Sequence, residues 1–339
     1  MAKNVIECPE YGCVTEVSPG ILWLRMPLPF DLDHINLYLI KDGQGWAAID
    51  TGLDTPETRQ AWEHIIGQLS GPITQVIVTH MHPDHVGLAG WLTERFRVPL
   101  FMTALEYYAA RALVAGGQGA SDWQDREYLM RAGEPFDAAK KAGESPKSAL
   151  QHVVSPLPVA FKRLNANTPV RIGSDDWTVM IGRGHSPEHA ALYSPSRKVL
   201  LSGDHILPGI SPNIGAYSTE PEANPLADYL GTLRPFLTLP KDTLVLPAHN
   251  TPFHKLHARI EQLMTHHHKH LDNLVSTLHT PATVADSLPV LFKRKLKGRN
   301  RMFAVAECLA HLNYLLEEKR ITRSVDGAGR YIYRSVAAG

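Results

Sequence analysis

The chain has 339 residues, enough for one large domain or two of ordinary size, and its 34 basic and 34 acidic side chains give a formal net charge of zero. This balance offers no global electrostatic field for a nucleic-acid or membrane partner. The sequence contains no apolar run of membrane-spanning length and no signal-peptide pattern, and its three cysteines lack the spacing of a metal knuckle or a disulfide framework. We therefore expect a cytoplasmic protein with no membrane partner.

The first part of the chain alternates short apolar segments with helical patterns. Strands are expected at 34–40, 45–50 and 73–80, and helices at 55–70 and 86–96. The first two strands form a hairpin, and Thr55 is a candidate cap for the first helix. A histidine-rich segment, residues 80–85, connects the third strand to the second helix. It therefore lies at the carboxyl end of a strand, where α/β folds usually place their chemistry.

Residues 104–165 interrupt this alternation with a helical pattern and then with pieces rich in glycine, proline and lysine. We interpret them as a helical insertion. Strands return after it, at 168–173, 177–185, 190–195, 198–204 and 242–249. Residues 1–255 are therefore expected to form one α/β catalytic domain that carries the insertion.

The strands stop after about residue 255, and residues 256–339 predict a small helical domain. An apolar face runs along a helix through 260–278, a second helix starts near Thr283, and a third covers about 301–318. Residues 321–334 predict a closing hairpin with glycines in its turn. Helices followed by such a hairpin suggest a winged-helix-like domain.

Four side chains of the types that bind zinc and similar ions occur within six residues, at His80, His82, Asp84 and His85. His80 and His82 alternate by two, so on an extended loop they point the same way, and Pro83 stiffens the turn that follows. Four such ligands can serve two adjacent ions. The alternative is a polar loop that is merely rich in histidine.

Three further ligand candidates, His185, Asp204 and His249, each close an apolar strand. Taken singly, each has an ordinary interpretation: a hydrogen-bonded loop histidine, an aspartate that caps a helix, and a half-buried histidine. Their shared position is informative, because strand ends on one edge of a sheet converge in space. The sequence therefore predicts that they join the histidine-rich segment in one metal site.

These motifs resemble the HxHxDH signature of the metallo-β-lactamase fold superfamily. The likeness includes THMHPDH (79–85) and, in the expected order, AIDTG (48–52), GHSPEH (184–189), SGD (202–204) and PAH (247–249). It covers about residues 15–255 and points to the glyoxalase II and lactonase-like group. The branch with a metal-binding cysteine is not favoured, because Asp204 stands where that cysteine would be. The resemblance implies an α/β fold, a four-layer αββα sandwich with its metals at one edge.

By matching motifs, the resemblance also implies two ions that share one bridging ligand. His80, His82 and His185 would bind one ion, Asp84, His85 and His249 the other, and Asp204 would bridge them. Asp50 would support the metal loop from behind, and His189, which lies beside a ligand, is a further candidate support. The two divalent ions are expected to be Zn²⁺, with iron or manganese as alternatives.

Such a site is expected to catalyse hydrolysis. Two divalent ions about 3.5–4 Å apart share a hydroxide that attacks an electrophilic carbonyl or phosphorus. Asp84 is the expected proton carrier to the leaving group. We favour an ester, thioester or lactone of a small or medium acyl substrate. Two enzymatic alternatives stay open: a phosphodiesterase or ribonuclease that acts on single-stranded RNA, and a persulfide dioxygenase with a single iron.

The insertion is expected to act as a lid that buries the substrate and excludes water. Its aromatic side chains could line a pocket, together with Asn213 from the segment after Asp204. The aromatic candidates are Tyr107, Tyr108, Trp123, Tyr128, Phe136 and Phe161. A lid of this kind suits a small-molecule substrate better than a long polynucleotide.

The C-terminal part carries a basic run: Lys293, Arg294, Lys295, Lys297, Arg299 and Arg301. The expected third helix has no lysine or arginine from 302 to 318, unlike a recognition helix. We therefore favour a role in packing or homodimer formation, and a non-catalytic nucleic-acid-binding regulator is a less favoured alternative. In the tract of histidines at 266–270, His267 falls on the apolar stripe and the others point outward, which favours a structural helix face.

Overall fold

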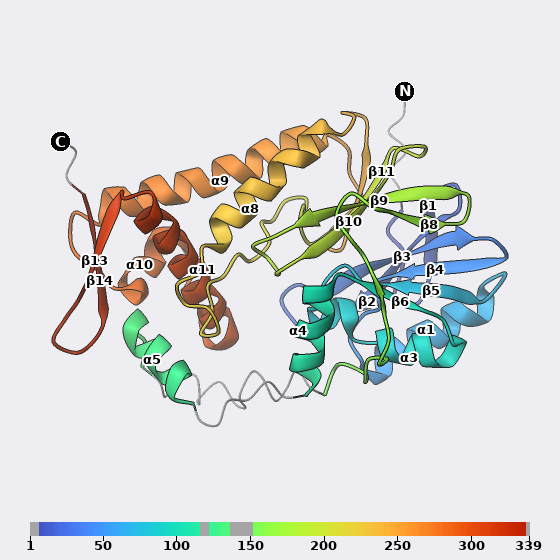
Figure 1. Cartoon of the computed structure of the whole chain (residues 1–339), viewed down its shortest axis with the longest axis horizontal. Helices are drawn as coiled ribbons and strands as arrows, with labels where there is room; N and C mark the ends of the chain where they lie inside the picture. Colours follow the sequence, from blue (N-terminus) through green and yellow to red (C-terminus); the bar gives the residue numbers. More distant parts are fainter. Residues whose placement is uncertain (1–6, 116–121, 136–151, 337–339) are drawn as a thin grey trace.

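The computed structural model describes residues 7–115, 122–135 and 152–336. Two β-sheets lie face to face, and helices cover the outer side of each sheet, as Figure 1 shows. The fold is therefore the four-layer αββα sandwich that the family resemblance implies. Among the helices in these three ranges, none is long and apolar enough to cross a membrane.

The first sheet contains strands in the order β1-β2-β3-β4-β5-β6-β7. They are β1 (Val14–Ser18), β2 (Ile21–Pro27), β3 (His34–Asp42), β4 (Gly45–Ile49), β5 (Ile73–Ile77), β6 (Leu100–Met102) and β7 (Lys162–Arg163). Neighbours from β1 to β4 are antiparallel, and neighbours from β4 to β7 are parallel. The parallel pairing places the carboxyl ends of β4 and β5 at the same edge of the sheet.

Helices α1 (Pro56–Gln68) and α3 (Ala89–Phe96) cover the outer face of this sheet, and the short α2 (Pro83–Val86) precedes α3. The predicted cap is confirmed, because the Thr55 side chain accepts a hydrogen bond from the backbone N–H of Thr58 at 3.2 Å. Trp62 of α1 and Leu92 of α3 are fully buried in the same apolar cluster as the sheet. Burial of each such side chain stabilises the fold by about 1.5–3 kcal/mol.

The second sheet has the order β12-β11-β10-β9-β8. Its strands are β8 (Pro169–Ile172), β9 (Asp175–Gly182), β10 (His189–Ser194), β11 (Val199–Gly203) and β12 (Leu244–Pro247). Its outer face is covered by α8 (Pro225–Leu233) and the 3-10 helix η1 (Arg234–Thr238). Only β11 and β12 are parallel neighbours, so β9, β11 and β12 all run in one direction. Trp23, Tyr38 and Trp177 are buried between the two sheets.

Three helices and a hairpin follow: α9 (Leu256–Thr277), α10 (Val284–Leu291), α11 (Gly298–Glu317), β13 (Ile321–Val325) and β14 (Tyr331–Ser335). The predicted start near Thr283 is confirmed, because Thr283 and Asp286 form a reciprocal capping box. Leu263 of α9 and Val305 of α11 belong to the same apolar cluster as Leu200 of the second sheet. Because this core continues across residue 255, the division into two domains and the winged-helix likeness stay predictions.

Strands β1 and β2 and helix α8 were not predicted from the sequence. The sequence of β2, ILWLRMP, is almost continuously apolar, so it lacks the alternation that identifies a half-buried strand. Helix α8 is short and begins with Asn224 as its cap and Pro225 in its first turn. Both elements depend on packing against the rest of the fold more than on a strong local pattern.

Candidate metal centre

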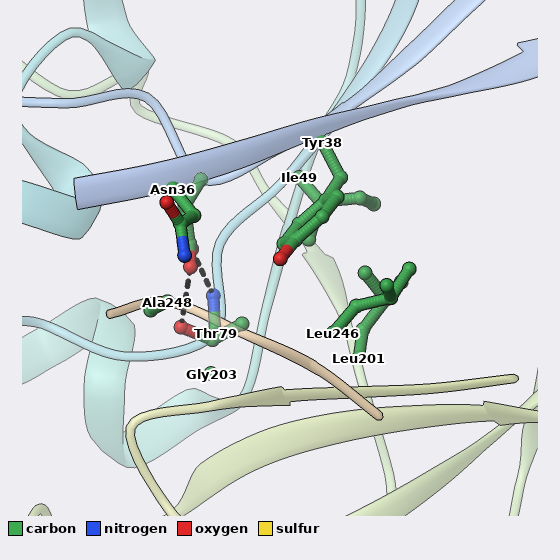
Figure 2. Close-up of a pocket in the computed structure, with 9 residues that line it drawn as sticks. Asn36, Tyr38, Ile49, Thr79, Leu201, Gly203, Leu246 and Ala248 are labelled. Atoms are coloured by element: carbon green, nitrogen blue, oxygen red, sulfur yellow. Dashed lines mark hydrogen bonds between the residues drawn. The ribbon is translucent and has the colours of Figure 1, made fainter. Parts of the chain in front are cut away.

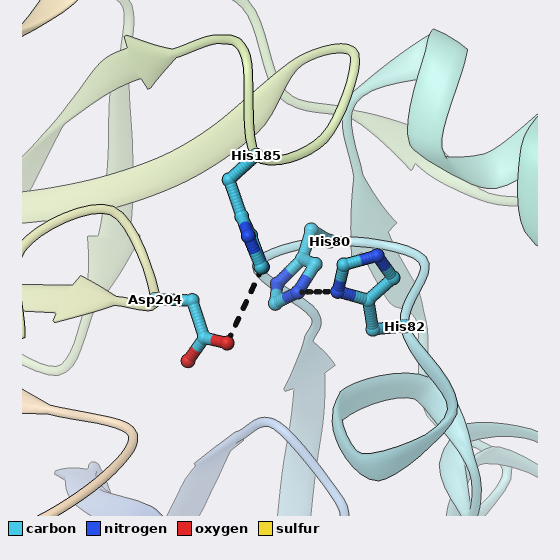
Figure 3. A group of neighbouring side chains, drawn as sticks. All are labelled: His80, His82, His185 and Asp204. Atoms are coloured by element: carbon cyan, nitrogen blue, oxygen red, sulfur yellow. Dashed lines mark hydrogen bonds and ion pairs between the residues drawn. The ribbon is translucent and has the colours of Figure 1, made fainter. Parts of the chain in front are cut away.

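The seven predicted ligands lie at the carboxyl ends of strands from both sheets. Residues 80–85 follow β5, His185 follows β9, Asp204 follows β11 and His249 follows β12. Their ligand atoms form two groups, and within each group all atoms lie within 4.8 Å of one another: His80, His82, His185 and Asp204 in one, and Asp84, His85 and His249 in the other. Figure 3 shows the first group. The structure therefore brings all seven side chains together.

Asp204 lies between the two groups and turns one carboxylate oxygen toward each. Its Oδ2 is 3.3 Å from His185 Nε2 in the first group. Its Oδ1 is 3.4 Å from His85 Nε2 and 3.3 Å from His249 Nε2 in the second group. A carboxylate placed in this way can bind an ion on either side.

Two ligand histidines are oriented by backbone carbonyl groups. His185 Nδ1 donates to the carbonyl oxygen of Asn213, and His249 Nδ1 donates to that of His34, each at 2.8 Å. A carbonyl oxygen only accepts, so Nδ1 of each ring carries a proton, and Nε2 is the atom whose lone pair can bind a metal. Both lone pairs consequently face Asp204 and the interior of the site.

Several atoms of the site suit a cation. The Nε2 atoms of His85 and His185 and the Oδ1 atom of Asp204 are buried, and within the described residues they have no hydrogen-bond partner. His80 Nε2 and His82 Nδ1 converge to 2.9 Å (Figure 3). Buried polar atoms are costly when they lack a partner, and bound cations would satisfy these atoms. The residues therefore fit metal ions.

Burial lowers the pKa of His80 and His82 well below its usual value, and neighbouring histidines lower it further. Both rings are thus neutral near neutral pH, the form in which imidazole binds metal. Burial also lowers the pKa of His85, but carboxylates, led by Asp204 and Asp50, outweigh burial and raise it well above its usual value. Negative charge is therefore concentrated around His85, and a divalent cation would neutralise it.

Asp50 lies behind the metal loop, at the end of β4. Its φ of 57° is in the left-handed region, which few residues other than glycine adopt. Its carboxylate accepts hydrogen bonds from the Thr79 backbone N–H at 2.7 Å and hydroxyl at 2.9 Å, and it lies 2.8 Å from His85 Nδ1. These contacts fix the orientation of the His85 ring.

His189 contacts the backbone of the central aspartate. Its Nε2 accepts a hydrogen bond from the Asp204 backbone N–H at 3.1 Å, and burial lowers its pKa well below the usual value. Gly203 makes this approach feasible, because its φ is 50° and a Cβ there would lie 2.3 Å from His189 Nε2. His189 is outside both ligand groups and holds the loop that carries Asp204.

Glu106 is a buried carboxylate that was not among the predicted site residues. It lies on α4 (Ala104–Val114), the first helix of the insertion. Its Oε2 accepts a hydrogen bond from the Met81 backbone N–H at 2.8 Å, and its Oε1 accepts one from the Glu188 backbone N–H at 2.6 Å. Met81 lies between two ligands, and Glu188 follows a third ligand by three residues. One carboxylate therefore joins two ligand loops. The local sequence did not indicate this role, because a glutamate in the first turn of a helix usually faces solvent.

The described parts of the insertion contact two different regions of the molecule. Helix α4 contacts the metal loops through Glu106, whereas α5 (Trp123–Ala132) packs near α10 and the hairpin (Figure 1). Tyr128 belongs to the apolar cluster of α9–α11, and its hydroxyl donates to the carbonyl oxygen of Ala216 at 2.9 Å. The expected lid over the metal edge stays a prediction, because the contacts of Tyr128 and Ala132 include both the C-terminal helices and the segment that follows Asp204. Trp123, at the start of α5, is 58% exposed.

The aromatic residues of α4 differ in their surroundings. Tyr107 is buried, its hydroxyl donates to the carbonyl oxygen of Pro158 at 2.7 Å, and its ring stacks on Phe161 at 3.9 Å. Tyr108 is 64% exposed, and Phe136 lies outside the described residues. The contacts of Tyr107 hold the insertion together, and a role of these side chains or of Trp123 in substrate binding stays a prediction.

Asn213, predicted as a pocket wall, connects the metal centre to α11. Its carbonyl oxygen accepts the His185 Nδ1 hydrogen bond, and its Nδ2 donates to Glu307 Oε2 at 3.0 Å. Burial raises the pKa of Glu307 to about 7. Asn213 therefore links a metal ligand to a buried carboxyl group of α11.

A small cavity of about 10 Å³ lies behind the metal loop, between the two sheets (Figure 2). Tyr38, Thr79 and Leu201 are among its lining residues. It has room for about one water molecule and is too small for a substrate. On the outer side of the site, solvent reaches the Asp84 side chain, which is 20% exposed.

The sandwich fold and the converging histidines and aspartates define the class of metal-dependent hydrolases. Residues 30–249 match the family model described as the metallo-beta-lactamase superfamily, and residues 271–336 match the model described as the metallo-beta-lactamase-like, C-terminal domain. The chain belongs to the metallo-beta-lactamase superfamily, and it is a metal-dependent hydrolase.

Similar proteins extend over most of the chain. It is 27% identical over 324 residues to a probable metallo-hydrolase, YqjP, of Bacillus subtilis, covering 91% of this chain and 96% of that relative. It is 26% identical over 260 residues to the human acyl-coenzyme A thioesterase MBLAC2, covering 72% of this chain and 83% of that relative. A beta-lactamase domain protein from Burkholderia ambifaria has a similar solved structure, with 39% identity, a TM-score of 0.91 and coverage of 98% of this chain and 97% of that chain.

Proposed function

We propose that the chain holds two divalent ions, most suitably Zn²⁺, and hydrolyses an ester, thioester or lactone of a small or medium acyl substrate. The observation that carries this proposal is the position of Asp204, whose two carboxylate oxygens face the two ligand groups separately. A site for one ion would not need a carboxylate between two sets of ligands.

When bound, two such ions would acidify water and polarise a carbonyl oxygen. The neutral imidazoles of His80 and His82 supply lone pairs to one group. Asp84 Oδ2 lies 3.7 Å from His85 Nε2 and 3.6 Å from His249 Nε2, on the side of the site that solvent reaches. From this position its carboxylate can take a proton and pass it to the leaving group.

One observation favours a thioester as the first substrate to test. The human relative is named an acyl-coenzyme A thioesterase. Solvent reaches the Asp84 side chain on the outer side of the site, and Glu106 binds the insertion helix α4 to the ligand loops. These features supply an edge at which a compact acyl group can bind, and the nucleic-acid and persulfide alternatives remain outcomes of the experiment.

The experiment compares wild type with Asp84→Asn on an aryl ester, an acyl thioester and a lactone. The variant should lose at least about 100-fold in kcat/KM, the lower range for loss of a proton-transfer group. Metal content is measured in the same samples, with two ions per chain expected in wild type. Asp242→Asn is the matched control, because Asp242 is an exposed carboxylate paired with Lys198.

Full activity in Asp84→Asn with unchanged metal content would contradict the proposal. One iron per chain with turnover of a persulfide would support the dioxygenase instead. Cleavage of single-stranded RNA, without turnover of any acyl substrate, would support the ribonuclease.

A further inference from the structure

Residues 293–301 span the segment between α10 and α11 and the first turn of α11. They carry six cationic side chains, and within the described residues two of these are paired with carboxylates. Arg294 lies 3.6 Å from Asp31 Oδ2, and Arg301 forms an ion pair with Glu134. The other four are Lys293, Lys295, Lys297 and Arg299, and within the described ranges none has a carboxylate at ion-pair distance. We call these four residues the basic rim.

One side of the basic rim contacts the loop between β2 and β3. The Arg299 guanidinium lies 5.2 Å from the centre of the Phe30 ring, and Asn300 Nδ2 is 3.3 Å from Asp31 Oδ2. That loop leads into His34, whose carbonyl oxygen accepts the Nδ1 hydrogen bond of the ligand His249. The basic rim therefore lies beside the loop that contacts the ligand His249.

The other side of the basic rim leads to the ligand His185. In the first turns of α11, the Phe303 carbonyl oxygen accepts a hydrogen bond from Asn213 Nδ2 at 3.4 Å, and Glu307 Oε2 accepts one from the same group at 3.0 Å. The Asn213 carbonyl oxygen in turn accepts from His185 Nδ1. Arg299 is one helical turn from Phe303. The basic rim therefore lies at the edge of the site, between the loop that contacts His249 and the segment that contacts His185.

Unpaired lysine and arginine side chains at an exposed edge favour phosphate groups, which accept several charge-assisted hydrogen bonds. The positive charge is confined to residues 293–301, because α11 has no lysine or arginine from residue 302 to its end. A polynucleotide needs a basic track that follows its backbone, and no such track continues along α11. A compact phosphate-bearing group fits this short patch better.

We propose that the basic rim binds the phosphate groups of the leaving thiol, and that the substrate is an acyl thioester of a phosphate-bearing thiol such as coenzyme A. This inference rests on the proposed hydrolysis of a thioester and adds the recognition of its leaving group. Water is added across the C–S bond, so the products are the carboxylic acid and the free phosphate-bearing thiol. The basic rim takes no part in the bond cleavage and acts on binding.

The test compares one acyl group on two thiols, coenzyme A and N-acetylcysteamine, which lacks phosphate. The variant is K293Q/K295Q/K297Q, and its matched control, K241Q/K269Q/K319Q, removes the same charge from exposed lysines elsewhere. The basic-rim variant should raise KM for the acyl-coenzyme A at least about tenfold, with kcat unchanged, as expected when only binding contacts are lost. Its kcat/KM for the N-acetylcysteamine thioester should equal that of wild type.

Binding of free coenzyme A, measured by calorimetry, separates this inference from the proposed function. Tight binding that weakens in the basic-rim variant, without turnover of either thioester, would support phosphate recognition and overturn thioester hydrolysis. Turnover of both thioesters with the same KM in wild type and variant would overturn the inference and leave the hydrolase intact. Weakened binding of single-stranded RNA in the variant, with coenzyme A binding unchanged, would also overturn it.

Discussion

The metal centre and the contact between α9 and α11 both gather several histidines, but the two clusters use them differently. In the helix cluster, the rings of His266, His267, His270 and His311 lie with centres 4.1–5.7 Å from a neighbour. His267 is fully buried and His266 is exposed, as the helical pattern predicts. Rings in the metal centre lie equally close, for example His80 and His82 at 4.6 Å.

The presence of carboxylates distinguishes the two clusters. In the helix cluster, His267 Nδ1 lies 3.2 Å from His311 Nε2, so these two nitrogen atoms satisfy each other, whereas His267 Nε2 is buried without a hydrogen-bond partner among the described residues. Burial, helped by neighbouring histidines, lowers the pKa of His267 to about 2. In the metal centre, burial also lowers the pKa of His249, but Asp204 outweighs it and raises the pKa. Histidine density alone therefore does not identify a metal site, and convergence with aspartates does.

The largest expected effect comes from Asp204→Asn, which removes the carboxylate between the two ligand groups. An amide cannot offer two anionic oxygens, so metal content should fall. The loss in kcat/KM should exceed the roughly 10–100-fold that is typical for partners outside the ligand set. Elemental analysis and hydrolysis assays on the same preparation measure both quantities.

Asp272→Asn is a suitable control for this variant, because Asp272 is an exposed carboxylate paired with Arg320. The control should retain metal and activity. Asp204→Asn with wild-type metal content and rate would show that the two groups do not depend on their shared carboxylate.

An intermediate effect is expected for Glu106→Gln, which keeps one acceptor oxygen and loses the other. One of the two ligand loops then loses its hydrogen bond, so metal affinity or kcat/KM should fall about 10–100-fold. A competitive chelator titration measures the affinity, and Glu127→Gln on α5 is the control within the insertion. A change in the free energy of unfolding with unchanged metal affinity would make Glu106 structural only.

The smallest effect on activity is expected for His267→Leu in the helix cluster. It leaves His311 Nε2 buried without its donor, which should cost about 1–3 kcal/mol in the free energy of unfolding. Metal content and kcat/KM should stay at wild-type values, and the exposed His268→Leu should leave stability within about 0.5 kcal/mol. Urea unfolding measures the stability, and loss of bound metal in His267→Leu would contradict the contrast between the clusters.

The predicted ligands illustrate what a sequence reveals about a site. His185, Asp204 and His249 each end an apolar strand, and the structure places all three beside residues 80–85. The prediction was possible because the local sequence shows where a strand ends. The carboxyl ends of parallel strands then lie at the same edge of a sheet. Glu106 was missed because its two partners are 25 and 82 residues away and no local pattern marks the contact.

By itself, the sequence determined the order of most strands and helices and the residues able to hold metal, because periodicity and ligand spacing are properties of short segments. The sandwich was implied by the resemblance of the sequence motifs to the metallo-β-lactamase superfamily. Only the tertiary structure decided how those segments meet. It placed Asp204 between the two groups, packed α5 against the C-terminal helices, and placed the basic rim beside the loops that contact His185 and His249. Each of these facts is a contact between residues far apart in the chain, which local patterns do not encode.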